Sequence, residues 1–142
     1  MSDDTGIRQF AFRQAAALLG RFAFELHRSL QTSDPEAVHD LRVSIRRFSQ
    51  ALRVFAPFFP PRVVKRIRRR LRAILDAASH VRDRDIALEF LDRAGLPPEA
   101  PLRAALKARR GEAERAFKDL LKDCESRGFS SRWRSRLHLA AT

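Results

Sequence analysis

The grouping of the prolines into three short breaks is the feature that most constrains the fold of this chain. All seven prolines lie in the stretches "SDPE", "PFFPP" and "LPPEAP", and the long segments between them contain few β-branched residues. Proline disrupts a helix interior but is well tolerated in a first helical turn. We therefore expect long helices over about residues 7–30, 35–56, 61–78 and 99–126.

Capping signals and apolar periodicity predict where the helices end and how they pack. Asp34 before Pro35 is typical of a helix start, and Gly128 is well placed to end the last long helix. Residues 79–95 either continue the third helix or restart it near Asp83. We predict an all-α fold, an antiparallel up-and-down bundle of about four helices over residues 1–128. A short basic tail follows over 129–142; it is weakly helical in character, and we do not assign it a regular element.

Positive charge is concentrated in one quarter of the chain. The formal net charge is +12, and residues 41–75 hold eleven Arg and Lys residues with no Asp or Glu. Eleven of the twelve excess charges therefore lie in this segment. A localised field of this kind indicates a polyanionic partner such as nucleic acid, an anionic membrane or polyphosphate.

The second and third predicted helices carry these cations beside their apolar stripes. At 100° per residue, the stripe of the second helix lies within about 40° of one direction and contains Leu41, Ile45, Phe48, Leu52 and Phe55. About 100–160° around the wheel lie His39, Arg42, Arg46 and Arg53. The third helix places Lys65, Arg68 and Arg72 in the same relation to its stripe. Cations at i and i+4 repel, so these ridges need negative charge from another helix or from a ligand.

The fourth predicted helix carries a further basic ridge, which one acidic residue, Glu114, dilutes. This ridge consists of Arg103, Lys107, Arg110 and Lys118. We expect it to be a weaker source of positive potential than the ridges of the second and third helices.

The sequence lacks the common catalytic and metal-binding patterns. His39 has no His, Cys or carboxylate at i+3 or i+4 with which to share a metal ion. Asp83 and Asp85 point in different directions on a helix, and we expect them to pair with arginines. There is no Gly-rich phosphate loop and no G-x-S-x-G motif, and Cys124 is expected to be buried and inert. We therefore expect a binding protein without catalytic residues, metal or cofactor, and disfavour a phosphohydrolase.

The expected location of the protein is the cytoplasm. No apolar run approaches the roughly 18 residues of a membrane span, and the first residues lack the apolar core of an export signal. A single cysteine excludes an internal disulfide framework.

Features of sequence-reading nucleic-acid binders are missing from the basic segment. A short recognition helix after a tight turn is not seen, nor are aromatic residues interleaved with the cations for base stacking. The phenylalanines lie mostly at core spacing, there is no Tyr, and Trp133 is isolated in the tail. Arg and Lys without exposed rings bind phosphate without reading bases. A general nucleic-acid-binding or scaffolding module remains the alternative function.

Two motifs resemble those of a known family. "VHDLRVSIRRFSQALRVF", with His39, Arg42, Arg46 and Arg47 at matching spacing, resembles the signature of the conserved histidine α-helical domain, CHAD. "VRDRD" resembles its second signature more weakly. The resemblance implies an all-helical, non-catalytic module that binds inorganic polyphosphate. Whether the protein associates with polyphosphate granules in the cytoplasm is left open by the sequence. The groove residues that it implies are His39, Arg42, Arg46, Arg53, Lys65, Arg68, Arg72 and, as a weaker member, Arg82, with Asp83 as a supporting partner.

The chain departs from the family pattern in three respects. Ser49 stands where family members usually carry a basic residue, and Ser79 replaces a common glycine. A full domain has two similar helical bundles, whereas this chain holds one His-Arg helix and so resembles half of that arrangement. We therefore expect two copies to pair as a homodimer. The candidate contact is a secondary apolar stripe of the first helix, formed by Phe12, Leu19, Ala23 and Leu30.

Overall fold

Three of the long helices begin where the prolines predict them. The computed structural model describes residues 2–139, and those residues contain helices and no strand. The elements are α1 (Ser2–Gln31), α2 (Pro35–Val54), the short 3₁₀ helix η1 (Ala56–Phe58), α3 (Pro61–Arg93), α4 (Pro101–Ser126) and α5 (Phe129–Arg136). A proline opens α2, α3 and α4, and the Asp34 carboxylate accepts a hydrogen bond of 3.0 Å from the backbone N–H of Glu36. The predicted all-α class is confirmed.

The third helix is continuous through the segment where the sequence left a restart open. α3 runs without a break from Pro61 to Arg93, because Ala78 and Val81 extend its buried stripe past the expected end. It ends before Gly95, whose positive φ of 76° is accessible to glycine.

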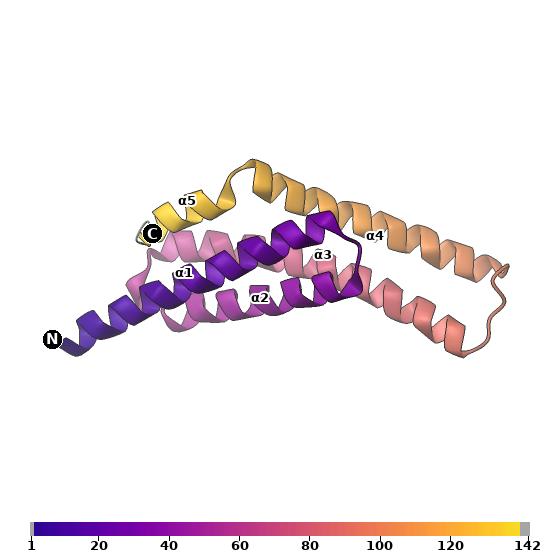
Figure 1. The fold of residues 1–142 in the computed structure, drawn as a ribbon, viewed down its shortest axis with the longest axis horizontal. Helices are drawn as coiled ribbons and strands as arrows, with labels where there is room; N and C mark the ends of the chain where they lie inside the picture. The colour runs from indigo at the N-terminus through magenta and orange to yellow at the C-terminus, as the bar shows by residue number, and fades with distance from the viewer. Residues whose placement is uncertain (1, 140–142) are drawn as a thin grey trace.

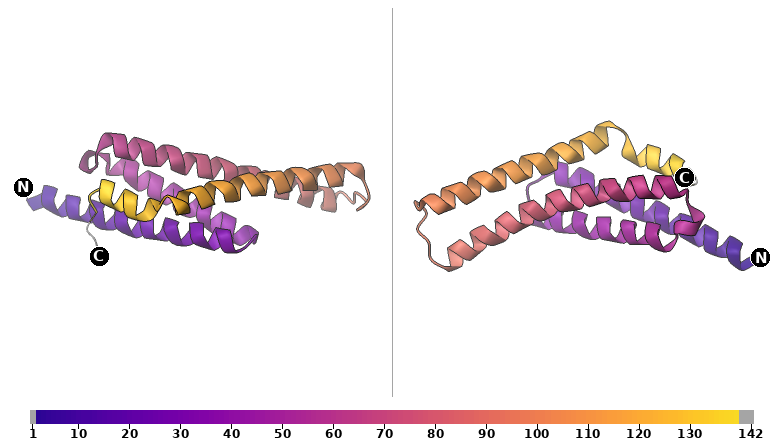
Figure 2. Two further views of the ribbon diagram at one scale, coloured as in Figure 1. Left: turned by 90° about the horizontal axis from the view of Figure 1, so that it is seen from above. Right: turned by 180° about the vertical axis from the view of Figure 1, so that it is seen from behind.

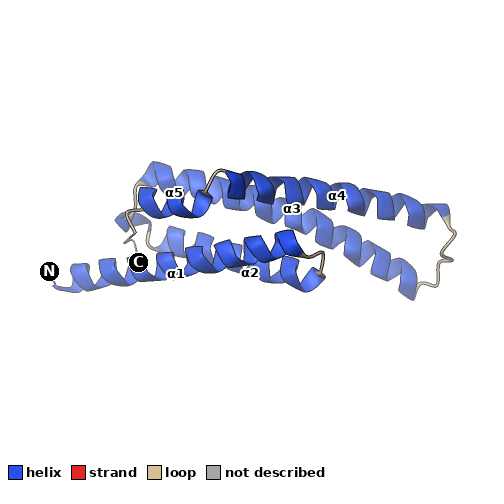
Figure 3. Ribbon diagram, turned by 45° about the horizontal axis from the view of Figure 1, so that its top comes forward, coloured by secondary structure: helices blue, strands red, loops and turns tan. Residues whose placement is uncertain are grey.

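Consecutive long helices pack against each other in antiparallel pairs, α1 on α2, α2 on α3, and α3 on α4 (Figure 1). α1 also contacts α4 and α5, which closes the bundle (Figure 3). The far half of the α3–α4 hairpin extends beyond the ends of α1 and α2, as both views in Figure 2 show. The bundle is therefore complete over one half of α3 and reduced to a two-helix hairpin over the other half.

One core runs along the bundle and accounts for the predicted apolar stripes. Its largest fully buried side chains include Phe22, Phe48, Phe117 and Leu71, and Cys124 is also buried, as predicted. Burial raises the pKa of the Cys124 thiol, which keeps it protonated. No helix within residues 2–139 combines the length and the apolarity needed to cross a membrane.

The basic tail has more structure than the sequence led us to expect. Residues 129–136 form α5, which folds back onto the bundle after Gly128, a residue with a positive φ of 65°. Phe129 and Trp133 are buried, and the Trp133 ring stacks on Phe22 with centroids 5.9 Å apart. The sequence indicated only weak helical character here, and packing against α1 stabilises a helix too short to form alone.

The apolar stripe proposed for a dimer contact on α1 is covered by the chain itself. Leu19 is fully buried, and the Phe12 ring stacks on Phe59 with centroids 5.4 Å apart. Ala23 and Leu30 also pack against the core. The prediction that this stripe contacts a second copy is therefore wrong, although it did identify a face that needs an apolar partner.

Candidate functional site

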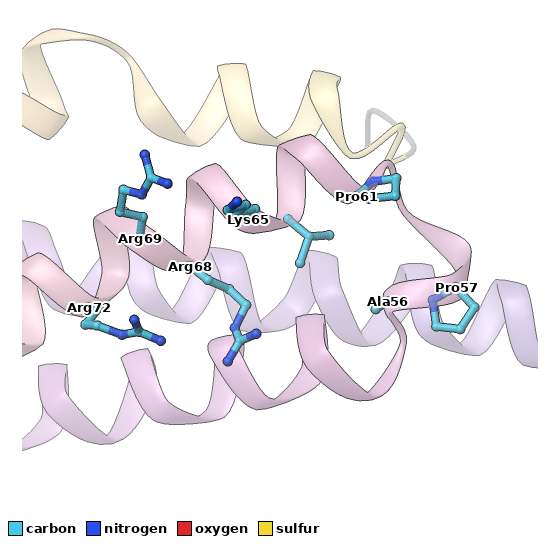
Figure 4. Close-up of a pocket in the computed structure, with 8 residues that line it drawn as sticks. Ala56, Pro57, Pro61, Lys65, Arg68, Arg69 and Arg72 are labelled. Carbon is cyan, nitrogen blue, oxygen red and sulfur yellow. The ribbon is translucent and has the colours of Figure 1, made fainter.

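Arginines from α2 and α3 line a groove between the two helices. Arg68 and Arg72 reach from α3 toward α2 (Figure 4), where Arg46 and Ser49 line the facing wall of a hollow of about 350 Å³. A second hollow of about 640 Å³ continues past the same two arginines to Lys65 and η1. Both hollows are lined by Arg68 and Arg72, so they adjoin each other. We call the two hollows together the α2–α3 trough, and its polar lining consists of Arg46, Ser49, Gln50, Lys65, Arg68, Arg69 and Arg72.

The trough contains positive charge without compensating negative charge. No Asp or Glu lines either hollow. Within residues 2–139, Arg46, Lys65 and Arg72 take part in no ion pair, and the Nε–H of Arg68 donates to the Ser49 hydroxyl at 3.3 Å. This follows from the sequence, because the acid-free segment 41–75 supplies both walls. The geometry leaves several guanidinium groups free to donate to an anion.

Arg42 continues this positive surface toward the middle of α3. Its Nε is buried and has no hydrogen-bond partner in the described part of the chain. Burial lowers the pKa of Arg42, and repulsion from Arg46 and Arg82 lowers it further, while Asp83 opposes the change. Arg42 is therefore a partly desolvated cation among other cations, an arrangement that a bound anion would relieve.

The two aspartates of "VRDRD" lie in different environments. Asp85 pairs with Arg110, whose Nε lies 2.8 Å from Oδ1, so the predicted pairing with an arginine is confirmed for this residue. Asp83 is exposed, makes no ion pair among the described residues, and supports the charge of Arg42 from a distance. Arg82 lies 4.0 Å from Glu89 in an exposed pair, which constrains it little.

His39 and Arg53 lie outside the lining of the trough. Both are exposed, His39 in the first turns of α2 and Arg53 in its last turn. Neither contributes to the two hollows between α2 and α3. Their part in binding an anion stays a prediction.

Arg69 lines the trough although the helical wheel did not select it. Figure 4 shows its side chain pointing away from α2, and together with Lys65 it lines the larger of the two hollows. The spacing of four residues between Lys65 and Arg69 is the sequence signal that would have identified it.

The cations of the basic ridge on α4 mostly pair within the protein, which the sequence did not predict. Arg103 is almost fully buried and pairs with Asp92, and Arg110 pairs with Asp85 and with Glu114. Lys118 donates to the backbone carbonyl of Thr32 at 3.0 Å. These three cations tie helices together and do not form an open basic surface.

Acidic, histidine and cysteine side chains do not gather into a metal-binding group. Among residues 2–139, no three of them lie close enough to hold a metal ion together. The charged chemistry that the described residues can perform is therefore dominated by guanidinium and ammonium donors.

Comparison with known proteins gives one match. The family model of the CHAD domain matches residues 13–142, which is nearly the whole chain and includes both walls of the trough. None of the curated proteins and none of the solved structures that were compared matches it.

Proposed function

Because this chain belongs to the CHAD domain family, we propose that it binds inorganic polyphosphate along the α2–α3 trough and acts as a non-catalytic binding module. Domains of this family are associated with the binding of polyphosphate and related phosphates, and they are generally not catalytic. The observation that carries the proposal is the presence of Arg46, Arg68 and Arg72 in one groove without a carboxylate.

Polyphosphate suits the trough because it is a linear anion without bases. Guanidinium groups bind phosphate oxygens through paired N–H donors, and this recognition needs no aromatic surface. Cations that face each other from two helices can hold successive phosphates of a chain lying between them. Each phosphate neutralised would release counterions, so the affinity should fall steeply with salt, by analogy with nucleic-acid binding.

The other groove residues are proposed to extend the binding surface beyond the trough. α2 and α3 are antiparallel, so Arg42 and Arg82 belong to one end of the contact between them, and Arg53 and Lys65 to the other. The eleven helical steps from Arg42 to Arg53 span about 16 Å of helix axis. We propose that a chain lies along this length and that His39 donates a further hydrogen bond at the Arg42 end.

Competition between polyanions tests this function. We expect unlabelled long-chain polyphosphate to displace labelled single-stranded RNA or DNA at equal charge concentration, whereas nucleic acid leaves labelled polyphosphate bound. The opposite order would favour the alternative, a general nucleic-acid-binding module. Incubation of polyphosphate with the protein and Mg²⁺ or Mn²⁺ should leave its chain length unchanged, and shortening would contradict a non-catalytic role.

We also propose that two copies of the chain pair as a homodimer and so rebuild a two-bundle arrangement. Its support is the exposure of three large apolar side chains on the extended α3–α4 hairpin, where Ile86, Phe90 and Leu102 are 48%, 68% and 54% exposed. Light scattering at micromolar concentration should give the mass of two chains, and Phe90→Ser should lower it. A single-chain mass with and without polyphosphate would overturn this proposal and leave the proposed trough intact.

A further inference from the structure

A second group of arginines surrounds a small pocket on another face of α3. The pocket has a volume of about 220 Å³ and lies between α3, the end of α4, and α5. Five arginines line it, and these are Arg66, Arg70, Arg127, Arg132 and Arg136. On α3, Arg66 and Arg70 point about 160° away from Arg68 and Arg72, so this pocket is separate from the trough. We call it the α5 pocket.

Two pairs of arginines four residues apart form opposite walls of the α5 pocket. Arg66 and Arg70 lie on α3, and Arg132 and Arg136 lie on α5, so each pair shares one face of its helix. The turn at Gly128 brings α5 back against α3. Like charges at this spacing repel within each pair and between the walls. The fold therefore gathers cations here against their mutual repulsion.

The negative charge near the α5 pocket does not balance these arginines. Asp123 lies 3.5 Å from Arg70 and 3.1 Å from Arg127, so a single carboxylate serves two guanidinium groups. Arg66, Arg132 and Arg136 make no ion pair with any described residue. The Cys124 thiol in the wall stays protonated, because burial raises its pKa, and adds no negative charge.

The remaining wall of the α5 pocket is rigid and apolar. Phe129 and Trp133 line it, and their rings make an edge contact with centroids 5.1 Å apart. Trp133 is also stacked on Phe22 at an interplanar angle of 6°. Because the Trp133 ring is packed in the core, it offers no free face on which a nucleobase could stack. A pocket held by core residues needs little reorganisation when it binds.

We propose that the α5 pocket is a second anion site, which binds a compact phosphate oxyanion. Its volume of about 220 Å³ accommodates an orthophosphate or pyrophosphate group. The same chemistry is available from a free phosphate or from the terminal phosphate of a longer chain. Arginines on three sides match the three or more oxygens of such a group.

Trp133 provides a direct probe, because it is the only tryptophan in the chain and it lines the pocket. Titration with pyrophosphate, followed by Trp133 fluorescence and by calorimetry, should show saturable binding. The double substitution Arg132→Ala and Arg136→Ala should weaken it at least tenfold. The matched control, Lys107→Ala with Arg109→Ala, removes two exposed charges on α4 and should leave the affinity unchanged. Thermal unfolding of each variant establishes that the fold is retained.

A trough variant separates this site from the proposed function. Arg46→Ala with Arg72→Ala should leave the pyrophosphate response intact while binding of long-chain polyphosphate weakens. Long-chain polyphosphate at equal end-group concentration should saturate the pocket if chain ends bind there, and orthophosphate alone should saturate it if the free ion is the ligand. The inference is overturned if neither fluorescence nor heat responds to any phosphate, if sulfate binds as tightly, or if the Arg132/Arg136 variant keeps its affinity.

Discussion

The same residue, arginine, has opposite surroundings in two regions of this molecule. In the α3–α4 hairpin, Arg103 and Arg110 bind Asp92, Asp85 and Glu114, a set that we call the α3–α4 clasp. Arg103 also donates to the backbone carbonyls of Leu96 and Pro97, at 2.6 Å and 3.4 Å. In the α2–α3 trough, the arginines meet no carboxylate.

The contrast extends to the effect of each environment on the charge. Hydrogen bonding to Asp85 is the main cause that raises the pKa of Arg110, and burial is the main cause that lowers the pKa of Arg42. One guanidinium is stabilised by its own protein, and the other is left with unsatisfied donors. The comparison teaches that clasp arginines stabilise the fold, whereas trough arginines are available for a ligand.

The largest expected effect is the loss of polyphosphate binding when two trough arginines are removed. Arg46→Ala with Arg72→Ala should weaken binding about 100-fold, since each charge-assisted hydrogen bond contributes about 1.5 kcal/mol. Calorimetric titration measures this change. The free energy of unfolding in urea should change by less than about 0.5 kcal/mol, because neither side chain makes an ion pair with a described residue of the free protein. Unchanged affinity would contradict the assignment of the trough arginines to ligand binding.

The converse substitution in the clasp should affect stability and spare binding. Arg110→Ala leaves Asp85 and Glu114 without their shared cation, and we expect a loss of about 2 kcal/mol in the free energy of unfolding. Urea unfolding measures the loss, and Arg109→Ala, an exposed neighbour, serves as the control. The affinity for polyphosphate should stay within about twofold. A stable Arg110 variant with impaired binding would reverse the assigned roles.

Acidification should weaken the clasp by a smaller amount. Burial alone would raise the pKa of Glu114, but hydrogen bonding from Ser33 and the charge of Arg110 lower it below its ordinary value of 4.5. A carboxyl whose pKa is lowered by folding stabilises the protein above that value and loses this contribution as the pH falls through its folded pKa. The free energy of unfolding should therefore fall below pH 4.5, and Glu114→Gln should reduce this dependence. Identical pH profiles for both proteins would contradict the prediction.

The smallest expected effect comes from the hydrogen bond that spans the trough. Ser49→Ala removes the acceptor of Arg68 Nε, and we expect a loss of about 0.5 kcal/mol in stability. Because the freed guanidinium keeps its charge, the affinity for polyphosphate should change by less than about threefold. A loss as large as that of the Arg46/Arg72 variant would show that Ser49 orients the site.

Much of the fold follows from local patterns in the sequence. Prolines mark the starts of α2, α3 and α4, and apolar residues at helical spacing identify the buried stripes of the long helices. The trough was foreseeable for the same reason, because its cations stand at fixed angles from those stripes. To place Arg46, Arg68 and Arg72 in one groove, only one further fact is required, namely that α2 and α3 are neighbours.

Interactions between distant segments could not be read from the sequence. Nothing in the local sequence indicates that Trp133 stacks on Phe22. A helix as short as α5 depends on such packing, so the sequence alone could not predict it. The wheel likewise grouped Arg103 and Arg110 as a basic ridge. Their partners Asp92 and Asp85 lie on α3, so this pairing depends on which helices are adjacent.

The most direct test of the central comparison follows the arginine Nε–Hε signals by nitrogen-15 NMR as polyphosphate is added. We predict that the signals of Arg46, Arg68 and Arg72 shift, because these guanidinium groups line the trough and bind phosphate oxygens. The signals of Arg103 and Arg110 should stay in place, because carboxylates and backbone carbonyls already occupy those groups. Shifts confined to the clasp, or no shift in the trough, would contradict the account.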